Sequence, residues 1–437
     1  MKIAFVHQPV SIISPTNVNS SIELITYELA RHLAENNEVI IYAKKFHNQK
    51  ECEYYQGVKY NRVSVPLDEW HTIVDSALGK LEAHLGAHTL SQTIRKFFFF
   101  RNTKRPLNAS RWYYYTFALK VARNLRKEKC DIAHIHTFSQ FVPIIRAFNR
   151  KIKIVLHMHC EWLTQFDFEM IEGRLRYTDL IIGVSDYITE KIRRRFPHLA
   201  NRCQTLHNAA AINTLGEESH QSVLNKNDVK KLLFVGRVSP EKGVHILLEA
   251  FQQVIKQYPQ VQLEIVGQQG ALAMETLIAL SEDSKEKDLK RFYRGNYISF
   301  LKNQLSSSET SKVSFLGVIP HRLLAKLYRD AHLCVVPSVC NEPGAVPVFE
   351  AMAMRCPLIA TRSGGTPEVV ADAKTGLLVE RGNAVALEEA ILRLLSDEEL
   401  RESIAEAGHE QVMKFYSWDK YVKKLLHLYK SVCSAED

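Results

Sequence analysis

The chain has 437 residues, of which 46% are hydrophobic and 24% are charged, and its formal net charge is +9. This is the composition of an ordinary globular protein, and the length exceeds what one hydrophobic core usually supports, so we expect two domains of about 200 residues each. No run of about 18 apolar residues is present, which excludes a membrane-spanning helix.

The N-terminus passes directly into an alternating apolar strand, "KIAFVHQP", without the long apolar core and cleavage site of a signal peptide. We therefore expect a cytoplasmic protein. The eight cysteines form no CxxC pair, and most lie in apolar stretches, so we expect them to be reduced and structural.

Short apolar runs then alternate with helical patterns in the first half of the chain. The helix "SSIELITYELARHLAEN" (20–36) is followed by the strand "EVIIYAKK" (38–45), and further strands are "DIAHIHT", "KIVLHMH", "DLIIGVS" and "RCQTLHNA". This order predicts a doubly wound parallel sheet of the α/β class. Ligands bind such sheets at the carboxyl ends of the strands, where these runs carry His, Ser or Asn.

Basic residues interleave with aromatic ones in "RKFFFFRNTKRP" (95–106) and "RWYYYTF" (111–117), and "KIRRRF" (191–196) adds more charge. Such segments suit an anionic membrane surface or a nucleic acid, although core helices with solvated basic flanks would look the same. No DNA- or RNA-binding pattern accompanies them, so nucleic acid is not an expected partner. We hypothesise peripheral contact with the inner face of the cell membrane through 95–117.

A polar segment at 212–230 predicts a linker, after which strand and helix patterns alternate again. The predicted domains are therefore 1–211 and 231–415, both Rossmann-like. Between them the strand ends would face across a cleft, and such clefts bind substrates. A charged insertion at 268–312 has no predicted role.

The segment "FVGRVSPEKG" places two cations at the end of a strand. The strand ends at Gly236, Arg237 follows, and Lys242 stands just before a helix. Phosphate is favoured there, beside helix N-terminal amides. The pattern predicts a site for a nucleotide diphosphate, whereas the alternative is a solvated turn with two surface cations.

Two carboxylates stand eight residues apart in "NEPGAVPVFEAMAM" (341–354). Pro343, Gly344 and Pro347 exclude one continuous helix between them, so Glu342 is expected in a loop and Glu350 at the start of a helix. They could hold hydroxyl groups at two places on one elongated ligand, such as the ribose and the hexose of a nucleotide sugar. Two glutamates at this spacing are also common by chance.

A third segment, "TRSGGTPEVV" (361–370), predicts a helix with Thr366 as N-cap, Pro367 at the first helical position and Glu368 in the first turn. Capping alone would explain most of this pattern.

These three segments, in this order, resemble the retaining GT-B glycosyltransferases of the large bacterial polysaccharide-assembly family, known as glycosyltransferase family 4 or group 1. The matching stretches are "GRVSPEKG" (236–243), Glu342-x7-Glu350, "EAMAMRCPLIATRSGGTPEVV" (350–370) and "GLLVERGN" (376–383). The stretch "FYSWDKYVKKL" (415–425) resembles the closing helix of the family. This resemblance implies that 416–437 packs back on the N-terminal domain.

The resemblance implies a donor site in the second domain. Arg237 and Lys242 would bind the diphosphate, Glu350 the ribose hydroxyls, and Glu342 a hydroxyl of the donor sugar. His159 would lie near the anomeric carbon, although a strand-end histidine with a local hydrogen bond is the alternative. The implied catalytic set is therefore His159, Arg237, Lys242 and Glu342. The other implied donor contacts are Gly236, Gly267, Val318, Gly344, Ala345, Val346, Ser20 and Ser21.

The chain departs from the family pattern at three places. Ser20 and Ser21 stand where the family carries a Gly-Gly pair, and serine restricts close approach of the backbone. "NAAA" (208–211) replaces "NGVD", and Gly344-Ala345 replaces "FG". Donor-sugar contacts are therefore expected to differ from those of typical members.

No DxD motif, which holds a metal in many transferases, occurs in the chain, so Arg237 and Lys242 would take the place of a metal. The resemblance implies metal-independent, retaining transfer of a hexosyl unit. The expected donor is UDP-glucose or a related UDP-hexose, and the expected acceptor is a saccharide, hypothetically lipid-linked, in exopolysaccharide, envelope polysaccharide or lipopolysaccharide synthesis. The alternatives are a GT-B sugar-nucleotide epimerase and a non-catalytic scaffold.

Overall fold

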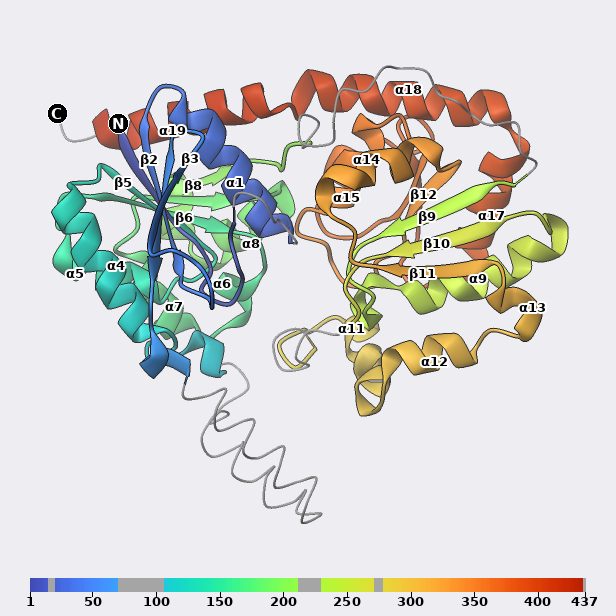
Figure 1. Cartoon of the computed structure of the whole chain (residues 1–437), viewed down its shortest axis with the longest axis horizontal. Coiled ribbons are helices and arrows are strands. Elements are labelled where there is room, and N and C mark those ends of the chain that lie inside the picture. Colours follow the sequence, from blue (N-terminus) through green and yellow to red (C-terminus); the bar gives the residue numbers. More distant parts are fainter. Residues whose placement is uncertain (15–19, 70–105, 211–228, 271–277, 435–437) are drawn as a thin grey trace, which may run out of the picture. The chain divides into compact units, whose positions relative to one another are not determined.

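The computed structural model describes residues 1–14, 20–69, 106–210, 229–270 and 278–434, which form two compact units (Figure 1). The first unit comprises Met1–Gly183, Thr189–Thr205 and Lys424–Asp437, and the second comprises Val184–Ile188 and Leu206–Lys423. The linker predicted at 212–230 lies almost entirely outside the described residues. The domain boundaries taken from the sequence stay predictions.

The first unit contains an eight-stranded sheet in the order β3-β4-β2-β1-β5-β6-β7-β8. All neighbouring strands are parallel except β3 and β4. The strand order reverses between β1 and β5, which is the doubly wound arrangement predicted from the sequence. The strands are β1 (Lys2–Val6), β2 (Glu38–Lys44), β3 (Cys52–Tyr55), β4 (Val58–Val63), β5 (Ile132–His136), β6 (Lys153–Met158), β7 (Leu180–Gly183) and β8 (Cys203–Thr205).

Helices connect these strands, and the first shows how the sequence sets its start. Ser20 is the N-cap of α1, where its hydroxyl accepts from the backbone N–H of Glu23 and the Glu23 carboxylate accepts in return from the N–H of Ser20. The helices of this part of the chain are α1 (Ser21–Ala34), α4 (Tyr115–Glu128), α5 (Phe141–Phe148), α6 (Trp162–Gln165), α7 (Phe168–Leu175) and α8 (Asp186–Arg195), with 3₁₀ turns at Pro66–Glu69, Leu107–Ala109 and Pro197–Arg202.

The sequence patterns did not lead us to predict the hairpin of β3 and β4. Its two-residue turn consists of Gln56 and Gly57, which have φ angles of +47° and +78°. Left-handed conformations at both turn positions match the right-handed twist of the flanking strands. The Gln-Gly pair was therefore the available signal, although glutamine is an unusual residue in this turn. The exposed Cys52 lies on β3, the edge strand.

The second unit contains a six-stranded parallel sheet in the order β11-β10-β9-β12-β13-β14. This is again the doubly wound order, with the reversal between β9 and β12. The strands are β9 (Lys231–Val235), β10 (Gln262–Val266), β11 (Val313–Gly317), β12 (Leu333–Val336), β13 (Leu358–Thr361) and β14 (Leu377–Val379). The helices of this later part of the chain are α9 (Val244–Gln257), α11 (Ser284–Asp288), α12 (Tyr297–Asn303), α13 (Ser307–Thr310), α14 (His321–Asp330), α15 (Val346–Ala353), α16 (Thr366–Val369), α17 (Ala384–Ser396), α18 (Glu398–Phe415) and α19 (Trp418–Ser434).

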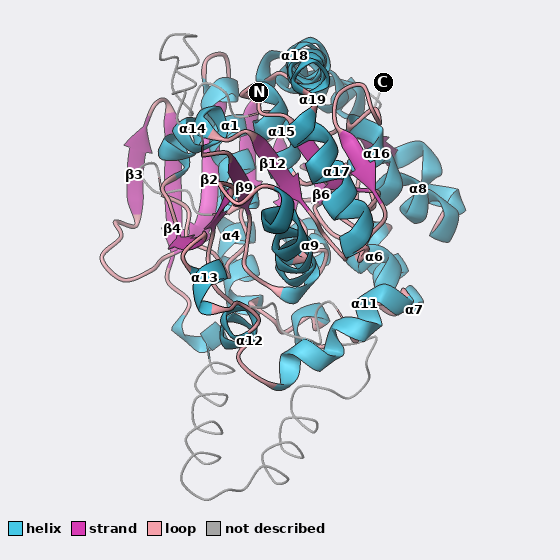
Figure 2. Ribbon diagram, turned by 90° about the vertical axis from the view of Figure 1, so that its right-hand side faces the viewer, coloured by secondary structure: helices cyan, strands magenta, loops and turns pink. Residues whose placement is uncertain are grey.

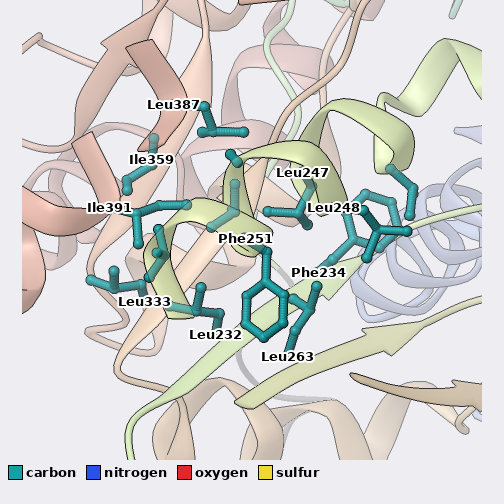
Figure 3. Packing of buried hydrophobic residues seen from close by; sticks show 14 of the residues in the cluster. Leu232, Phe234, Leu247, Leu248, Phe251, Leu263, Leu333, Ile359, Leu387 and Ile391 are labelled. Carbon is teal, nitrogen blue, oxygen red and sulfur yellow. The ribbon is translucent and has the colours of Figure 1, made fainter. Parts of the chain in front are cut away.

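Alternate residues of the strands in the second sheet belong to two separate hydrophobic cores, because successive side chains of a strand point to opposite faces of the sheet. Leu232 and Phe234 pack with Phe251 of α9 and with α17 (Figure 3). Figure 2 shows α9 and α17 side by side on this face. Leu233 instead packs with α14, α15 and α18, through residues such as Phe349. Both faces of the sheet are therefore covered, which leaves only its edges and strand ends for binding.

The helix α19 begins in the second unit and ends in the first, because the residues from Lys424 onward belong to the first unit. There the Tyr429 hydroxyl lies 2.6 Å from Nδ1 of His134 on β5. The C-terminal helix therefore returns to the N-terminal unit, as the resemblance implies.

Two predicted helix starts were wrong. The helix α15 begins at Val346, so Glu350 lies in its second turn and not at its start, because proline is tolerated in a first helical turn and Pro347 does not delay the helix. The N-cap of α16 is Gly365, and Thr366 is already helical without capping by its side chain. Pro367 consequently occupies the second helical position.

In the described part of the chain, no helix is both long and apolar enough to cross a membrane. All eight cysteines lie among the described residues, and none of them forms a disulfide.

Candidate functional site

Three loops meet at the carboxyl edge of the second sheet: 236–243 after β9, 337–345 after β12 and 362–365 after β13. Glycines allow them to touch. A Cβ at Gly243 would lie 1.9 Å from the carbonyl oxygen of Pro337, and one at Gly364 would lie 2.1 Å from that of Glu342. Backbone bonds join the loops further, since Val339 N donates to Glu241 O at 2.9 Å and Gly365 N to Glu342 O at 2.8 Å. These contacts and hydrogen bonds fix the position of each loop relative to the loop beside it.

Lys242 and Glu342 form the central ion pair of these loops. Lys242 Nζ lies 2.6 Å from Glu342 Oε1, and the Ser338 hydroxyl donates to the same oxygen at 2.5 Å. Glu342 is buried, and burial alone would disfavour the charged form of both groups. Their mutual attraction outweighs burial, so the pKa of Lys242 lies above and that of Glu342 below the ordinary value. Both are therefore charged at neutral pH.

Arg237 has a partner that the sequence did not predict. Its guanidinium donates to Glu241 Oε1, with NH2 at 2.8 Å and Nε at 3.2 Å, and the Glu241 side chain is almost fully buried. Tyr293 donates to the other oxygen of Glu241 at 3.4 Å. Glu241 therefore orients Arg237 beside Lys242. The acid in "PEKG" was visible in the sequence, but its partner Tyr293 lies 52 residues away.

Glu350 is also buried and holds two residues of α14. His321 Nε2 lies 2.6 Å from Glu350 Oε1, and the Tyr328 hydroxyl donates to Glu350 Oε2 at 2.8 Å. A carboxylate can accept about four hydrogen bonds, so this geometry leaves capacity for hydroxyl groups. His321 and Tyr328 were not predicted as site residues.

The remaining predicted donor contacts lie around this edge. Gly236 and Gly267 follow β9 and β10, and both have positive φ angles, +156° and +143°. Val318 follows β11 and is 54% exposed. Gly344 and Ala345 line a small pocket together with His207 and Gly365. Val346 is the first residue of α15, and the first backbone N–H groups of a helix have no acceptor within the helix.

Ser20, Ser21 and His159 belong to the first unit. Ser20 is engaged as the N-cap of α1, and Ser21 is exposed. His159 belongs to a histidine cluster at the carboxyl edge of the first sheet, which consists of His7, His134, His136, His157 and His159. The structure therefore shows a cluster where the sequence singled out one histidine.

Hydrogen bonds link the rings of this histidine cluster. His136 Nδ1 lies 2.9 Å from His159 Nε2, and His134 Nε2 lies 3.1 Å from His157 Nδ1. Burial lowers the pKa of His7, His134 and His159 to about 3, and it also holds the pKa of His136 and His157 well below the ordinary value. All five are therefore neutral at physiological pH.

Among the residues that the structure describes, two groups have the composition of a metal site. The candidate ligand atoms of His134, His136 and His157 lie within 4.8 Å of one another, as do those of Asp186, His207 and Glu368. In the second group, Glu368 already accepts from two backbone N–H groups and lies 2.8 Å from His207 Nε2. The absence of a metal requirement stays a prediction.

The comparisons with known proteins agree with this geometry. Residues 22–213 match Glycosyltransferase Family 4, and residues 216–411 match Glycosyl transferases group 1. An uncharacterized glycosyltransferase of Methanocaldococcus jannaschii is 30% identical over 324 residues, which are 72% of this chain and 80% of that protein. The chain belongs to the group 1 glycosyltransferases.

Solved structures show the fold of this glycosyltransferase. Sucrose-phosphate synthase of Thermosynechococcus elongatus has a TM-score of 0.67 at 19% identity, with 100% of each chain covered. HepE of Anabaena, in complex with UDP and glucose, has a TM-score of 0.66 at 17% identity over 99% of this chain and 100% of that one. The fold is therefore GT-B, as the resemblance predicted.

Adding one methyl group at Gly243 of this glycosyltransferase is expected to lower the free energy of unfolding by about 3 kcal/mol. Gly243 has a φ of +74°, and its new Cβ would overlap Pro337 O. Gly382 is a matched control with a φ of +71° and no described atom within 4 Å of an added Cβ. Gly382→Ala should cost only about 1 kcal/mol of backbone strain. Urea unfolding of both variants measures the difference, and equal losses would contradict the close loop contact.

Proposed function

We propose that this glycosyltransferase moves a hexosyl unit from a UDP-sugar to a saccharide acceptor, with retention of configuration and without a metal. The observation that carries the proposal is the pair of cations, Arg237 and Lys242, held by Glu241 and Glu342 at the switch point of the second sheet. In doubly wound sheets, ligands bind at this point. Two fixed cations at a strand edge suit a nucleotide diphosphate.

In the proposed reaction these cations stabilise the leaving group. Negative charge grows on the diphosphate as the bond to the sugar breaks, and positioned charges that meet it in the transition state lower the barrier. Lys242 stays protonated because its pKa is raised by Glu342, despite burial. The acceptor would attack from the leaving-group side, and the departing phosphate would help to remove its proton. His159 stays the candidate for contact near the anomeric carbon.

The remaining roles follow from which hydroxyl groups the donor offers. Glu342, next to the cations, would accept from the sugar, and Glu350 would accept from the ribose while His321 and Tyr328 keep it in place. The choice of UDP and a hexose is supported by HepE, whose structures hold UDP, glucose and UDP-glucose. The proposed setting is the assembly of an exopolysaccharide, envelope polysaccharide or lipopolysaccharide.

Titration calorimetry with UDP, GDP and ADP, each with and without EDTA, tests the donor and the metal. We expect UDP to bind most tightly, EDTA to have no effect, and Glu350→Ala to weaken binding. Binding that EDTA abolishes would refute metal independence, and binding of none of the three would favour the scaffold alternative. NMR of the anomeric proton of the product tests retention, which an inverted product would disprove.

The proposed acceptor is lipid-linked, with peripheral membrane contact through 95–117. Residues 95–105 of this segment lie outside the described residues. In the described remainder, Trp112 is 57% exposed, and the Arg111 guanidinium lies 4.7 Å from the centre of its ring. An exposed indole beside a cation suits the interface of an anionic membrane.

Trp112→Ala is therefore expected to reduce co-sedimentation with liposomes that contain anionic lipid by about five- to tenfold, because a large apolar ring no longer enters the interface. Phe415→Ala is the control, since Phe415 is an equally exposed aromatic residue, at 57%, in the second unit. Binding that is unchanged in Trp112→Ala, or that does not depend on anionic lipid, would count against this contact.

A further inference from the structure

The charged insertion at 268–312 contacts the loop that carries Glu342. Its helix α11 begins after Asp283, whose Oδ1 accepts from the backbone N–H groups of Lys285 at 2.9 Å and Glu286 at 3.3 Å. This N-cap fixes the start of the helix. It also places the second carboxylate oxygen of Asp283 and the carboxylate of Glu286 side by side.

Both carboxylates hold Asn341, the residue directly before Glu342. Asn341 N donates to Glu286 Oε1 at 2.8 Å, and Asn341 Nδ2 donates to Asp283 Oδ2 at 3.2 Å. Asn341 Oδ1 accepts in turn from Gly364 N at 3.4 Å. Asn341 is therefore held from two sides, its main-chain N–H by the insertion and its side-chain oxygen by the loop after β13.

Arg381, in the loop after β14, supplies a cation beside these two acids. Its NH2 donates to Asp283 Oδ2 at 2.6 Å, and its NH1 donates to the carbonyl of Val339 at 3.0 Å and lies 4.0 Å from Glu286 Oε1. Burial would raise the pKa of Asp283, but the hydrogen bonds from Arg381 and Asn341 outweigh burial and hold it below the ordinary value. Charge-assisted bonds of this kind are about twice as strong as neutral ones.

We propose that Asp283, Glu286 and Arg381, called here the Asn341 clamp, position Glu342 for the sugar of the donor. The inference rests on the proposed function and assigns a role to the insertion. Lys242 and Ser338 anchor the carboxylate of Glu342, whereas the clamp anchors its main chain. Arg237 and Glu350 have separate partners, Glu241 and the pair His321 and Tyr328. The clamp is therefore expected to affect the part of donor affinity that comes from the sugar more than the nucleotide part, to which it is coupled through the pair of Glu342 with Lys242.

The test compares three variants of the full chain. Arg381→Met removes the cation of the clamp, and Arg381→Lys keeps its charge. Arg401→Met is the matched control, because Arg401 likewise pairs with a carboxylate, Glu398, and a backbone carbonyl, Leu394 O, in the same unit, but among helices α17 and α18. Hydrogen exchange of amides 338–344 reports on the clamp itself. Titration with UDP and with UDP-glucose reports on its function.

In Arg381→Met we expect exchange at 338–344 to become about tenfold faster, with no change at 313–317. The affinity for UDP should stay within about twofold, while the ratio of UDP-glucose to UDP affinity falls about tenfold, the effect of losing one charge-assisted hydrogen bond. Arg381→Lys should restore part of the ratio, and Arg401→Met should match the wild type. A variant that only unfolds would lose both ligands together.

Unchanged exchange in Arg381→Met would overturn the clamp. Faster exchange with an unchanged ratio of UDP-glucose to UDP affinity would show that the clamp only stabilises the loop. It would overturn the proposal that the clamp positions Glu342 for the sugar. A wild-type chain that binds neither UDP nor UDP-glucose would refute the proposed function, and the role in sugar binding with it, whereas the exchange measurement would still decide whether the clamp exists.

Discussion

Lys242→Ala is expected to lower kcat/KM for UDP release by about 10²- to 10³-fold, the usual effect of removing one group that stabilises transition-state charge. The reason is the place of Lys242, next to Arg237 at the strand edge and already aligned by Glu342. Lys231→Ala is the control, because Lys231 forms a more exposed pair with Glu264 at the start of β9. Its activity should equal that of the wild type.

The same substitution should also destabilise the protein, because it leaves Glu342 buried with one hydroxyl partner, Ser338. Breaking a buried ion pair from one side costs about 3–5 kcal/mol. The double variant Lys242→Met/Glu342→Gln removes both charges and should recover most of the melting temperature but none of the activity. Activity that returns together with stability would show that Lys242 has only a structural role.

Mild acid is expected to unfold the first unit, through the histidine cluster. In the folded chain, burial lowers the pKa of His7, His134 and His159 to about 3, and holds that of His136 and His157 well below the ordinary value. In the unfolded chain each pKa returns to about 6.5. Below pH 6.5 these histidines therefore bind protons in the unfolded state but not in the folded state. The free energy of unfolding consequently falls as the pH is lowered to about 3.

Each histidine contributes about 1.4 kcal/mol over the window from pH 7.5 to 5.5, so five together remove up to about 7 kcal/mol. This is comparable to the whole stability of a typical domain. Calorimetry across this range measures the loss, and proteolysis at pH 5.5 should cut the first unit before the second. His157→Asn should reduce the proton uptake on unfolding by about one. An uptake below about two protons in the wild type would contradict the prediction.

The sequence predicted the fold well because the fold rests on local patterns. Apolar runs and helical periodicity within a few residues were enough for the two sheets, and "GRVSPEKG" located Arg237 and Lys242 on their loop. Helix starts were less certain, since Pro347 is compatible with both a helix break and a first turn. The error at Glu350 has this cause.

The partners of the site residues could not be predicted in the same way. Arg381 and Asp283 lie 98 residues apart, and Lys242 and Glu342 lie 100 apart, so no periodicity connects them. Their contact follows only once the sheet brings the loops after β9, β12 and β14 to one edge. The histidine cluster is similar, because His134 and His157 are neighbours only through the pairing of β5 with β6.

The hairpin at the edge of the first sheet exposes one cysteine, which should make labelling by a thiol reagent selective. Cys52 on β3 is exposed, whereas five of the eight cysteines are buried, and Cys160 and Cys433 are only partly accessible. Burial further raises the pKa of the Cys160 thiol to about 12, so that this thiol has almost no reactive thiolate at neutral pH. A maleimide dye added in stoichiometric amount should therefore attach first at Cys52 of the natural chain. The edge strand thus offers a site for a fluorescent probe of the first unit without any substitution.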